Sequence, residues 1–175
     1  MPFKVISREP PGDEQALRER SSRIVDALVE LGVTHAVGIP DNMSRLIFEL
    51  CDARPAVQLV PVCREGEAWG IASGLWVGGQ CPVVIIQNTG FYESGDALRG
   101  TAIEMGVPLL TLLGYRGYRS LSTQNVDSAA RFFEPMLRAW GMLYWILEKQ
   151  REAEVLHDAF TQARVSRRPV AVLMA

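Results

Sequence analysis

The sequence predicts an α/β fold with an open, doubly wound, mostly parallel sheet and helices on both faces. Segments with helical periodicity alternate with short apolar segments throughout the chain. The segments 82–87 and 108–113 are apolar on both sides, which is typical of parallel strands covered by helices on each face. No repeat, low-complexity tract or shift of composition divides the 175 residues, so one domain is expected over residues 13–175.

The first half of the chain begins with an expected extended arm at residues 1–12, which contains Pro2, Pro10 and Pro11. A helix is predicted at 16–31 because its apolar residues recur on one side, and Gly32 is placed to end it. Asp41 or Ser44 can cap the helix that contains Leu46, Ile47 and Leu50. The further elements are a strand at 34–39, a strand at 57–62, a helix at 65–77 and a strand at 82–87.

The second half continues the alternation. After a strand-to-helix loop, a helix capped by Ser94 is expected at 94–104, and Gly114 ends the next strand. The segment 115–127 is rich in Gly, Ser, Thr, Gln and Asn, which predicts a long loop. The remaining segments are a strand at 108–113, helices at 129–140 and 148–164 around a short apolar run at 142–146, and a last strand at 169–174.

Composition excludes several classes of function. A formal net charge of -2 argues against a general nucleic-acid-binding protein, which carries a basic excess. The longest apolar runs fall far short of the roughly 20 residues of a membrane span, and the first residues lack the apolar core of a signal peptide, so we expect a cytoplasmic protein. Three scattered cysteines and two distant histidines predict neither a disulfide framework nor a metal site.

Four glycines recur every four residues along the predicted helix 65–77, at Gly66, Gly70, Gly74 and Gly78. Each costs about 1 kcal/mol relative to alanine in a helix interior. We expect such a face where another backbone or a flat ligand approaches closely. Alternatively, Gly78 simply ends the helix.

Ligands of doubly wound sheets bind beyond the carboxyl ends of the strands, which directs attention to the segments 38–44, 62–69 and 87–96. The sequence contains no GxxxxGK[ST], GxGxxG or GxSxG motif at a fitting position. Cys63 at a strand end could be the nucleophile of a small hydrolase, with His35 as its base. The carboxylate of Glu65 could also do no more than cap its helix. A further alternative is a binding or regulatory module that has this fold and lacks catalysis.

A set of motifs in fixed order is more specific than any of these features. The chain contains Gly38-Ile39-Pro40-Asp41, then Arg64-Glu65-Gly66-Glu67-Ala68, then Gln87-Asn88-Thr89-Gly90, and finally Gly114-Tyr115-Arg116-Gly117. From about residue 16 to residue 172 it resembles the pyrimidine-binding (PYR) domain of thiamine-diphosphate-dependent decarboxylases. The pattern is most similar to the α subunit of sulfopyruvate decarboxylase and the matching half of phosphonopyruvate decarboxylase.

The resemblance implies a catalytic glutamate. In this family one glutamate contacts N1′ of the aminopyrimidine and so promotes removal of the proton from C2 of the thiazolium. The motif places this glutamate at Glu65, with Glu67 as the nearest rival. The resemblance further implies cofactor contacts at Gly38, Pro40, Gln87, Asn88, Thr89 and Gly90. The substrate pocket is expected to include Asp41, Asn42, Phe91, Tyr92, Glu93 and Arg116.

The resemblance also implies that the diphosphate-binding domain of the enzyme belongs to another chain. The family binds the diphosphate and Mg²⁺ through a second domain with a GDG motif and a downstream asparagine, whereas this chain has Ser94-Gly95-Asp96-Ala97. We therefore expect a separate β subunit with the diphosphate-binding (PP) domain, which holds Mg²⁺ in an α2β2-type assembly. The expected reaction is decarboxylation of a small 2-oxo acid. Tyr92, Glu93 and Asp96 replace small or amide residues of the relatives, which favours a less anionic, bulkier or aromatic substrate.

Overall fold

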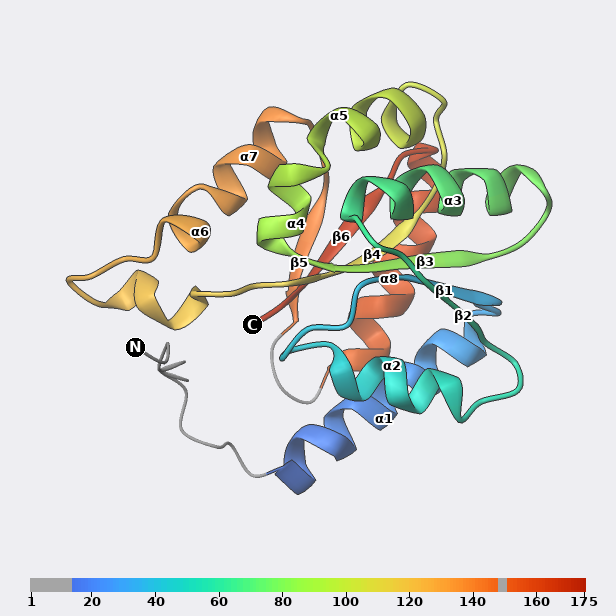
Figure 1. Cartoon of the computed structure of the whole chain (residues 1–175), viewed down its shortest axis with the longest axis horizontal. Coiled ribbons are helices and arrows are strands. Elements are labelled where there is room, and N and C mark those ends of the chain that lie inside the picture. The colour runs from blue at the N-terminus through green and yellow to red at the C-terminus, as the bar shows by residue number, and fades with distance from the viewer. Residues whose placement is uncertain (1–13, 148–150) are drawn as a thin grey trace, which may run out of the picture.

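A computed structural model describes residues 14–147 and 151–175, and the strands in this part of the chain form one parallel sheet of order β2-β1-β3-β4-β6-β5 (Figure 1). This arrangement confirms the predicted α/β fold. The predicted arm at residues 1–12 lies outside the described residues. The strands are β1 (His35–Gly38), β2 (Gln58–Pro61), β3 (Pro82–Gln87), β4 (Leu110–Gly114), β5 (Tyr144–Leu147) and β6 (Val170–Met174).

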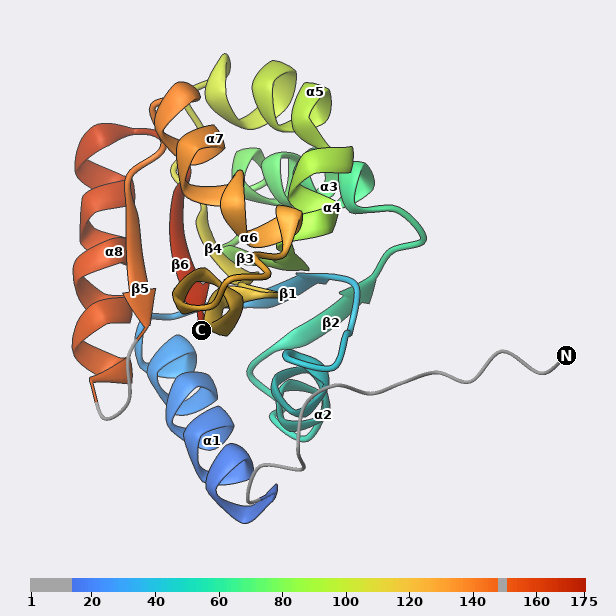
Figure 2. The ribbon, with the colours of Figure 1, turned by 90° about the vertical axis from the view of Figure 1, so that its left-hand side faces the viewer.

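Helices cover both faces of the sheet, as Figures 1 and 2 show. In the strand β3, Val83 and Ile85 belong to the hydrophobic core on one face of the sheet, whereas Val84 and Ile86 belong to the core on the other face. Because successive side chains of a strand point to opposite faces, both sets must be apolar. One face carries α1 (Glu14–Glu30), α2 (Arg45–Asp52) and α8 (Glu152–Ser166). The other carries α3 (Glu65–Val77), α4 (Asn88–Glu93), α5 (Gly95–Ala97), the π-helical turn η1 (Leu98–Ile103), α6 (Ser128–Arg131) and α7 (Phe133–Ala139).

The segment after β3 differs from the prediction. The expected loop was wrong, because α4 begins at Asn88 directly after the strand. The helix predicted at 94–104 is present as α5 and η1, which follow a break in the helical path at Ser94. At this break the buried hydroxyl of Ser94 accepts a hydrogen bond from Trp69 Nε1 (2.8 Å) and donates one to the carbonyl of Phe91 (3.3 Å). Polar residues and a glycine suggested a loop, but tertiary hydrogen bonds favour a helix here.

The later elements are shorter than expected. The helix predicted at 129–140 divides at Phe132 into α6 and α7, and the loop 115–127 contains the 3₁₀ turn η2 (Tyr118–Ser122). The apolar run at 142–146 gives the edge strand β5. The start of the helix predicted at 148–164 falls on residues that are not described. Within the described ranges, no helix combines the length and apolarity needed to cross a bilayer.

The order in which successive strands join the sheet changes direction at β1. From β1 it passes to β2 on one side and then crosses back to β3 on the other side. A Cβ atom at Gly38, the last residue of β1, would lie only 1.8 Å from the carbonyl oxygen of Ile85 in β3, so only glycine permits this approach. Ligands of doubly wound sheets bind at such a switch point, beside the carboxyl ends of the strands.

Candidate functional site

The side chain of Glu65 lies against the backbone of Gly90 at the carboxyl end of the sheet. Glu65 begins α3 shortly after β2, and Gly90 lies in the first turn of α4 after β3. A Cβ atom at Gly90 would lie 2.3 Å from Glu65 Cγ and 2.4 Å from its Oε1. The absence of a side chain at position 90 therefore makes room for this carboxylate, and two motifs 25 positions apart meet at one place.

Glu65 and Glu67 have different surroundings. Glu67 Oε2 accepts hydrogen bonds from the backbone N–H groups of Cys63 (2.9 Å) and Arg64 (3.2 Å), so this carboxylate caps the start of α3. The half-buried Glu65 carboxylate accepts no hydrogen bond from the described residues. Glu67 is thus occupied by the backbone, whereas Glu65 is free to bind a ligand.

An ion pair joins the ends of the two helices beside Glu65. Arg64 at the start of α3 pairs with Glu93 at the end of α4. The hydrogen bond and charge of Glu93 raise the pKa of the Arg64 guanidinium. Both side chains reach solvent, so the pair positions charge at the edge of the site more than it stabilises the fold. Asp96 is exposed and pairs with Arg99.

The β1–α2 loop is held by Asp41. Its Oδ1 accepts hydrogen bonds from the N–H groups of Met43 (2.7 Å) and Ser44 (2.9 Å), which forms a tight turn before α2. Its Oδ2 is buried without a hydrogen-bond partner among the described residues and faces Gly114, whose Cβ would lie 3.4 Å away. Pro40 and Asn42 are exposed on the same loop.

Asn88 is buried and holds the neighbouring loop in place. Its Nδ2 donates to the carbonyl oxygens of Arg116 and Ala129, both at 3.0 Å. The side chain therefore ties α4 to the segment after β4. Thr89 is exposed and donates its hydroxyl hydrogen to Gln87 Oε1 (2.9 Å), so these two side chains remain at the open edge of the sheet.

The aromatic residues expected in the substrate pocket point into the protein. Phe91 is buried in the core, and its ring lies 5.6 Å from that of Phe133 in an edge-to-face arrangement. The hydroxyl of Tyr92 donates to the carbonyl of Ala129 (2.7 Å), and burial raises the pKa of Tyr92 to about 12. The exposed Arg116 lies 3.8 Å from Asp127. Of the residues predicted for this pocket, Asn42, Glu93 and Arg116 are the exposed ones.

The alternative in which His35 activates Cys63 is wrong. His35 begins β1 and is paired with Gln58, the first residue of the parallel strand β2. Cys63 lies five residues after Gln58, beyond the other end of β2. At roughly 3.3 Å per residue of extended chain, it is about 16 Å along the strand direction from the level of His35. The His35 ring also bonds through Nδ1 with Thr34 Oγ1 (2.8 Å). The two side chains lie at opposite ends of the strands.

A hydrogen-bond network behind the site was not predicted from the sequence. Glu134 of α7 accepts hydrogen bonds from the hydroxyls of Tyr115 (2.9 Å) and Tyr144 (2.8 Å). Burial, followed by the hydrogen bond to Glu134, raises the pKa of Tyr115. The network holds Tyr115, the first residue after β4, against α7. No sequence pattern signals it, because its three members lie in separate elements.

Comparison with known proteins is consistent with this geometry. Residues 19–133 match the family model described as "Thiamine pyrophosphate enzyme, N-terminal TPP binding domain". Sulfopyruvate decarboxylase subunit alpha of Methanothermobacter thermautotrophicus is 30% identical over 130 residues, which are 74% of each chain. The protein of the same name in Methanococcus maripaludis is 22% identical over 88% of this chain and 93% of its own. Sulfopyruvate decarboxylase of Methanosarcina acetivorans is 22% identical over 87% of this chain but 39% of its own.

Proposed function

Because this chain belongs to the thiamine pyrophosphate enzymes and contains their N-terminal TPP-binding domain, we propose that it is the α subunit of a two-subunit 2-oxo acid decarboxylase. The observation that carries the proposal is the free Glu65 carboxylate against Gly90, beside the switch point of the sheet. Two relatives named as subunit alpha match most of this chain and most of their own length, which supports a separate subunit formed by residues 13–175.

The residues at the carboxyl end of the sheet fit the pyrimidine half of the cofactor. When bound, thiamine diphosphate supplies the carbon nucleophile and the electron sink of decarboxylation. Glu65 would share a proton with N1′ of its pyrimidine, since its carboxylate has no protein donor among the described residues. Gly38, Pro40, Gln87, Thr89 and Gly90 would surround the ring. Asn88 would act indirectly, because its amide holds the adjacent loop.

The diphosphate half of the cofactor would bind to a partner subunit. Among the residues that the structure describes, no cluster of three or more His, Cys, Asp or Glu side chains could hold a metal ion. We therefore assign Mg²⁺ and the diphosphate to the PP domain of a β subunit in an α2β2-type assembly. The glycine face of α3 supports this assignment, since Gly70 and Gly74 are exposed and a Cβ at either position would meet no described atom within 4 Å.

The substrate is a small 2-oxo acid that approaches between the β1–α2 loop and the segment after β4. Arg64 and Arg116 each face a carboxylate of the same chain, Glu93 and Asp127 respectively. Neither guanidinium is therefore fully available to a second anionic group such as a sulfonate or phosphonate. We infer a substrate with a neutral side chain.

Reconstitution tests the function. The chain is combined with the PP-domain subunit of the same organism, thiamine diphosphate and Mg²⁺, and release of carbon dioxide from sulfopyruvate, phosphonopyruvate and phenylpyruvate is measured. We expect cofactor-dependent turnover that requires both chains and favours phenylpyruvate. Activity of either chain alone would contradict the two-subunit assignment. Binding without turnover of any 2-oxo acid would favour a regulatory module, and rapid turnover of the two dianionic substrates would overturn the substrate class.

A further inference from the structure

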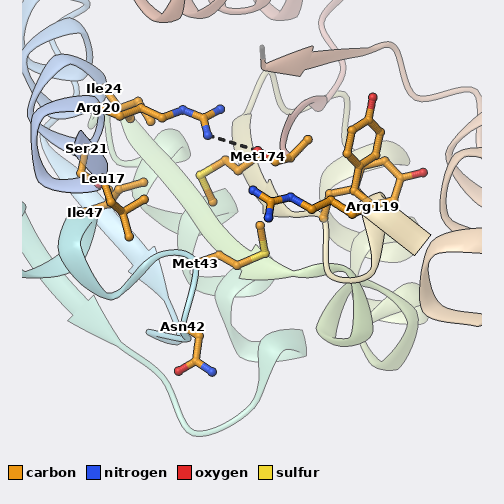
Figure 3. A pocket seen from close by; sticks show the side chains of 12 residues that line it. Leu17, Arg20, Ser21, Ile24, Asn42, Met43, Ile47, Arg119 and Met174 are labelled. Atoms are coloured by element: carbon orange, nitrogen blue, oxygen red, sulfur yellow. Dashed lines mark hydrogen bonds between the residues drawn. The ribbon is translucent and has the colours of Figure 1, made fainter. Parts of the chain in front are cut away.

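The candidate site has an open side and a closed side. Figure 3 shows Asn42, Met43 and Arg119 around a pocket of about 160 Å³, on the side from which the proposed function brings the substrate. On the closed side, Glu65 at the start of α3 contacts Gly90 of α4. Because the Glu65 carboxylate accepts no hydrogen bond from the described residues, its position depends on how α3 is placed against α4.

A second contact between the same two segments lies about one helical turn further along. Trp69 follows Glu65 by four residues, and Ser94 follows Gly90 by four residues. The indole Nε1 of Trp69 donates a hydrogen bond to the hydroxyl of Ser94 at 2.8 Å. Four residues span about 6 Å of an α-helix, at roughly 1.5 Å per residue. The two contacts therefore hold α3 and α4 in one register.

Both partners of this second contact are buried. Trp69 is 0% exposed and Ser94 is 2% exposed. The Ser94 hydroxyl also donates to the carbonyl of Phe91 (3.3 Å), so one hydroxyl binds the last turn of α4 and joins it to α3. By contrast, the ion pair between Arg64 and Glu93 connects the same two helices in contact with solvent, where such pairs contribute little. The placement of α3 against α4 thus depends mainly on the buried bond.

We propose that Ser94 is a positioning residue for Glu65. This role rests on the proposed function, in which the Glu65 carboxylate shares a proton with the cofactor. Loss of the Ser94 hydroxyl leaves the indole N–H of Trp69 without its acceptor in the core, which favours movement of the ring and of the first turn of α3. A displacement of about 1 Å can cost roughly a hundredfold in rate. Ser94 is buried and therefore acts on the reaction through the position of Glu65.

Nuclear magnetic resonance of the full chain, without cofactor, tests the placement of Glu65 independently of activity. Glutamate is isotope-labelled at the side-chain carboxyl carbon, and the signal of Glu65 is assigned with Glu65→Gln. We expect Ser94→Ala to shift this signal at constant pH. Thr111→Val is the matched control, because it removes another buried hydroxyl, whose bond to the carbonyl of Val170 (2.8 Å) lies in the sheet. The control should leave the Glu65 signal in place, and an unchanged signal in Ser94→Ala would overturn the proposal.

Kinetics of the reconstituted enzyme tests the consequence for the reaction, at a temperature at which circular dichroism shows each variant to be folded. Ser94→Ala should lower kcat about tenfold and leave KM for the 2-oxo acid within about twofold, whereas Thr111→Val should retain kcat. Trp69→Phe removes the other partner of the same hydrogen bond. Combined with Ser94→Ala, it should therefore lower kcat little further than either change alone.

The outcomes separate this proposal from the proposed function. If Glu65→Gln is inactive but Ser94→Ala retains full kcat, the positioning role is wrong and the function of Glu65 stands. If the wild-type enzyme turns over no 2-oxo acid, the proposed function is wrong, and the carboxyl signal of Glu65 alone decides whether Ser94 places this side chain.

Discussion

Gly90 in α4 and Glu65 in α3 touch so closely that no side chain can be added at position 90 without displacing the carboxylate. A Cβ there would lie 2.3–2.5 Å from the Cγ, Cδ and Oε1 atoms of Glu65. The contact joins the starts of two helices that follow β2 and β3, the neighbours of β1. It therefore fixes the carboxylate beside the switch point of the sheet.

Gly90→Ala should destabilise the chain by about 1 kcal/mol, because the added methyl group overpacks the contact with Glu65. Shortening the neighbour by Glu65→Ala should relieve most of this cost. Urea unfolding of the wild type, both single variants and the double variant measures the coupling free energy, which we expect to be about 0.5–1 kcal/mol. Additive effects would show that the two residues do not touch. Gly66→Ala is a matched control, since its Cβ would lie at an ordinary 3.6 Å from Ala97 Cβ.

Gly70→Ala and Gly74→Ala should each stabilise the isolated chain by about 0.5–1 kcal/mol, because alanine favours the helix and no described atom opposes the methyl group. If the glycine face contacts the β subunit, the same variants should weaken the complex. Thermal unfolding of the isolated chain and sedimentation of the mixture measure the two effects. Unchanged association would place the interface elsewhere.

Asn88→Ala should lower the free energy of unfolding by about 2–4 kcal/mol. The substitution leaves the carbonyl oxygens of Arg116 and Ala129 without their donor and removes a buried side chain. Urea unfolding measures this loss, and limited proteolysis should detect faster cleavage in the segment 115–127. A stable variant with normal resistance to protease would show that Asn88 does not hold this segment.

Stability should fall as the pH rises from about 10 to 12. Burial raises the pKa of Tyr92 to about 12, above its ordinary value near 10. In this interval the folded chain binds more protons than the unfolded chain, so unfolding becomes more favourable with rising pH. Tyr92→Phe should reduce this pH dependence, and the raised pKa of Tyr115 should account for the part that remains. At pH 7 the same substitution should lower the free energy of unfolding by about 1 kcal/mol, because the hydrogen bond to the carbonyl of Ala129 is lost. A slope unchanged in Tyr92→Phe, measured by urea unfolding at several pH values, would contradict the role of Tyr92.

Local patterns predict much of this fold. The helix at 65–77 and the strand at 82–87 have the predicted bounds, because periodicity and flanking glycines mark both elements clearly. The helix α4 was missed because Asn88 and Gly90 favour turns, and the bonds that stabilise it go to residues far along the chain. The family resemblance indicated Glu65, but it could not reveal the contact of this side chain with Gly90.

The different surroundings of the two glutamates allow a direct test of the account. Glu65→Gln and Glu67→Gln are each reconstituted with the proposed β subunit, and kcat for decarboxylation is measured alongside the free energy of unfolding. We expect Glu65→Gln to lower kcat at least a hundredfold with little effect on stability. Glu67→Gln should lose up to about 1 kcal/mol of stability, because its carboxylate caps α3, and should retain most activity. Full activity in Glu65→Gln would contradict the central claim that this carboxylate activates the cofactor.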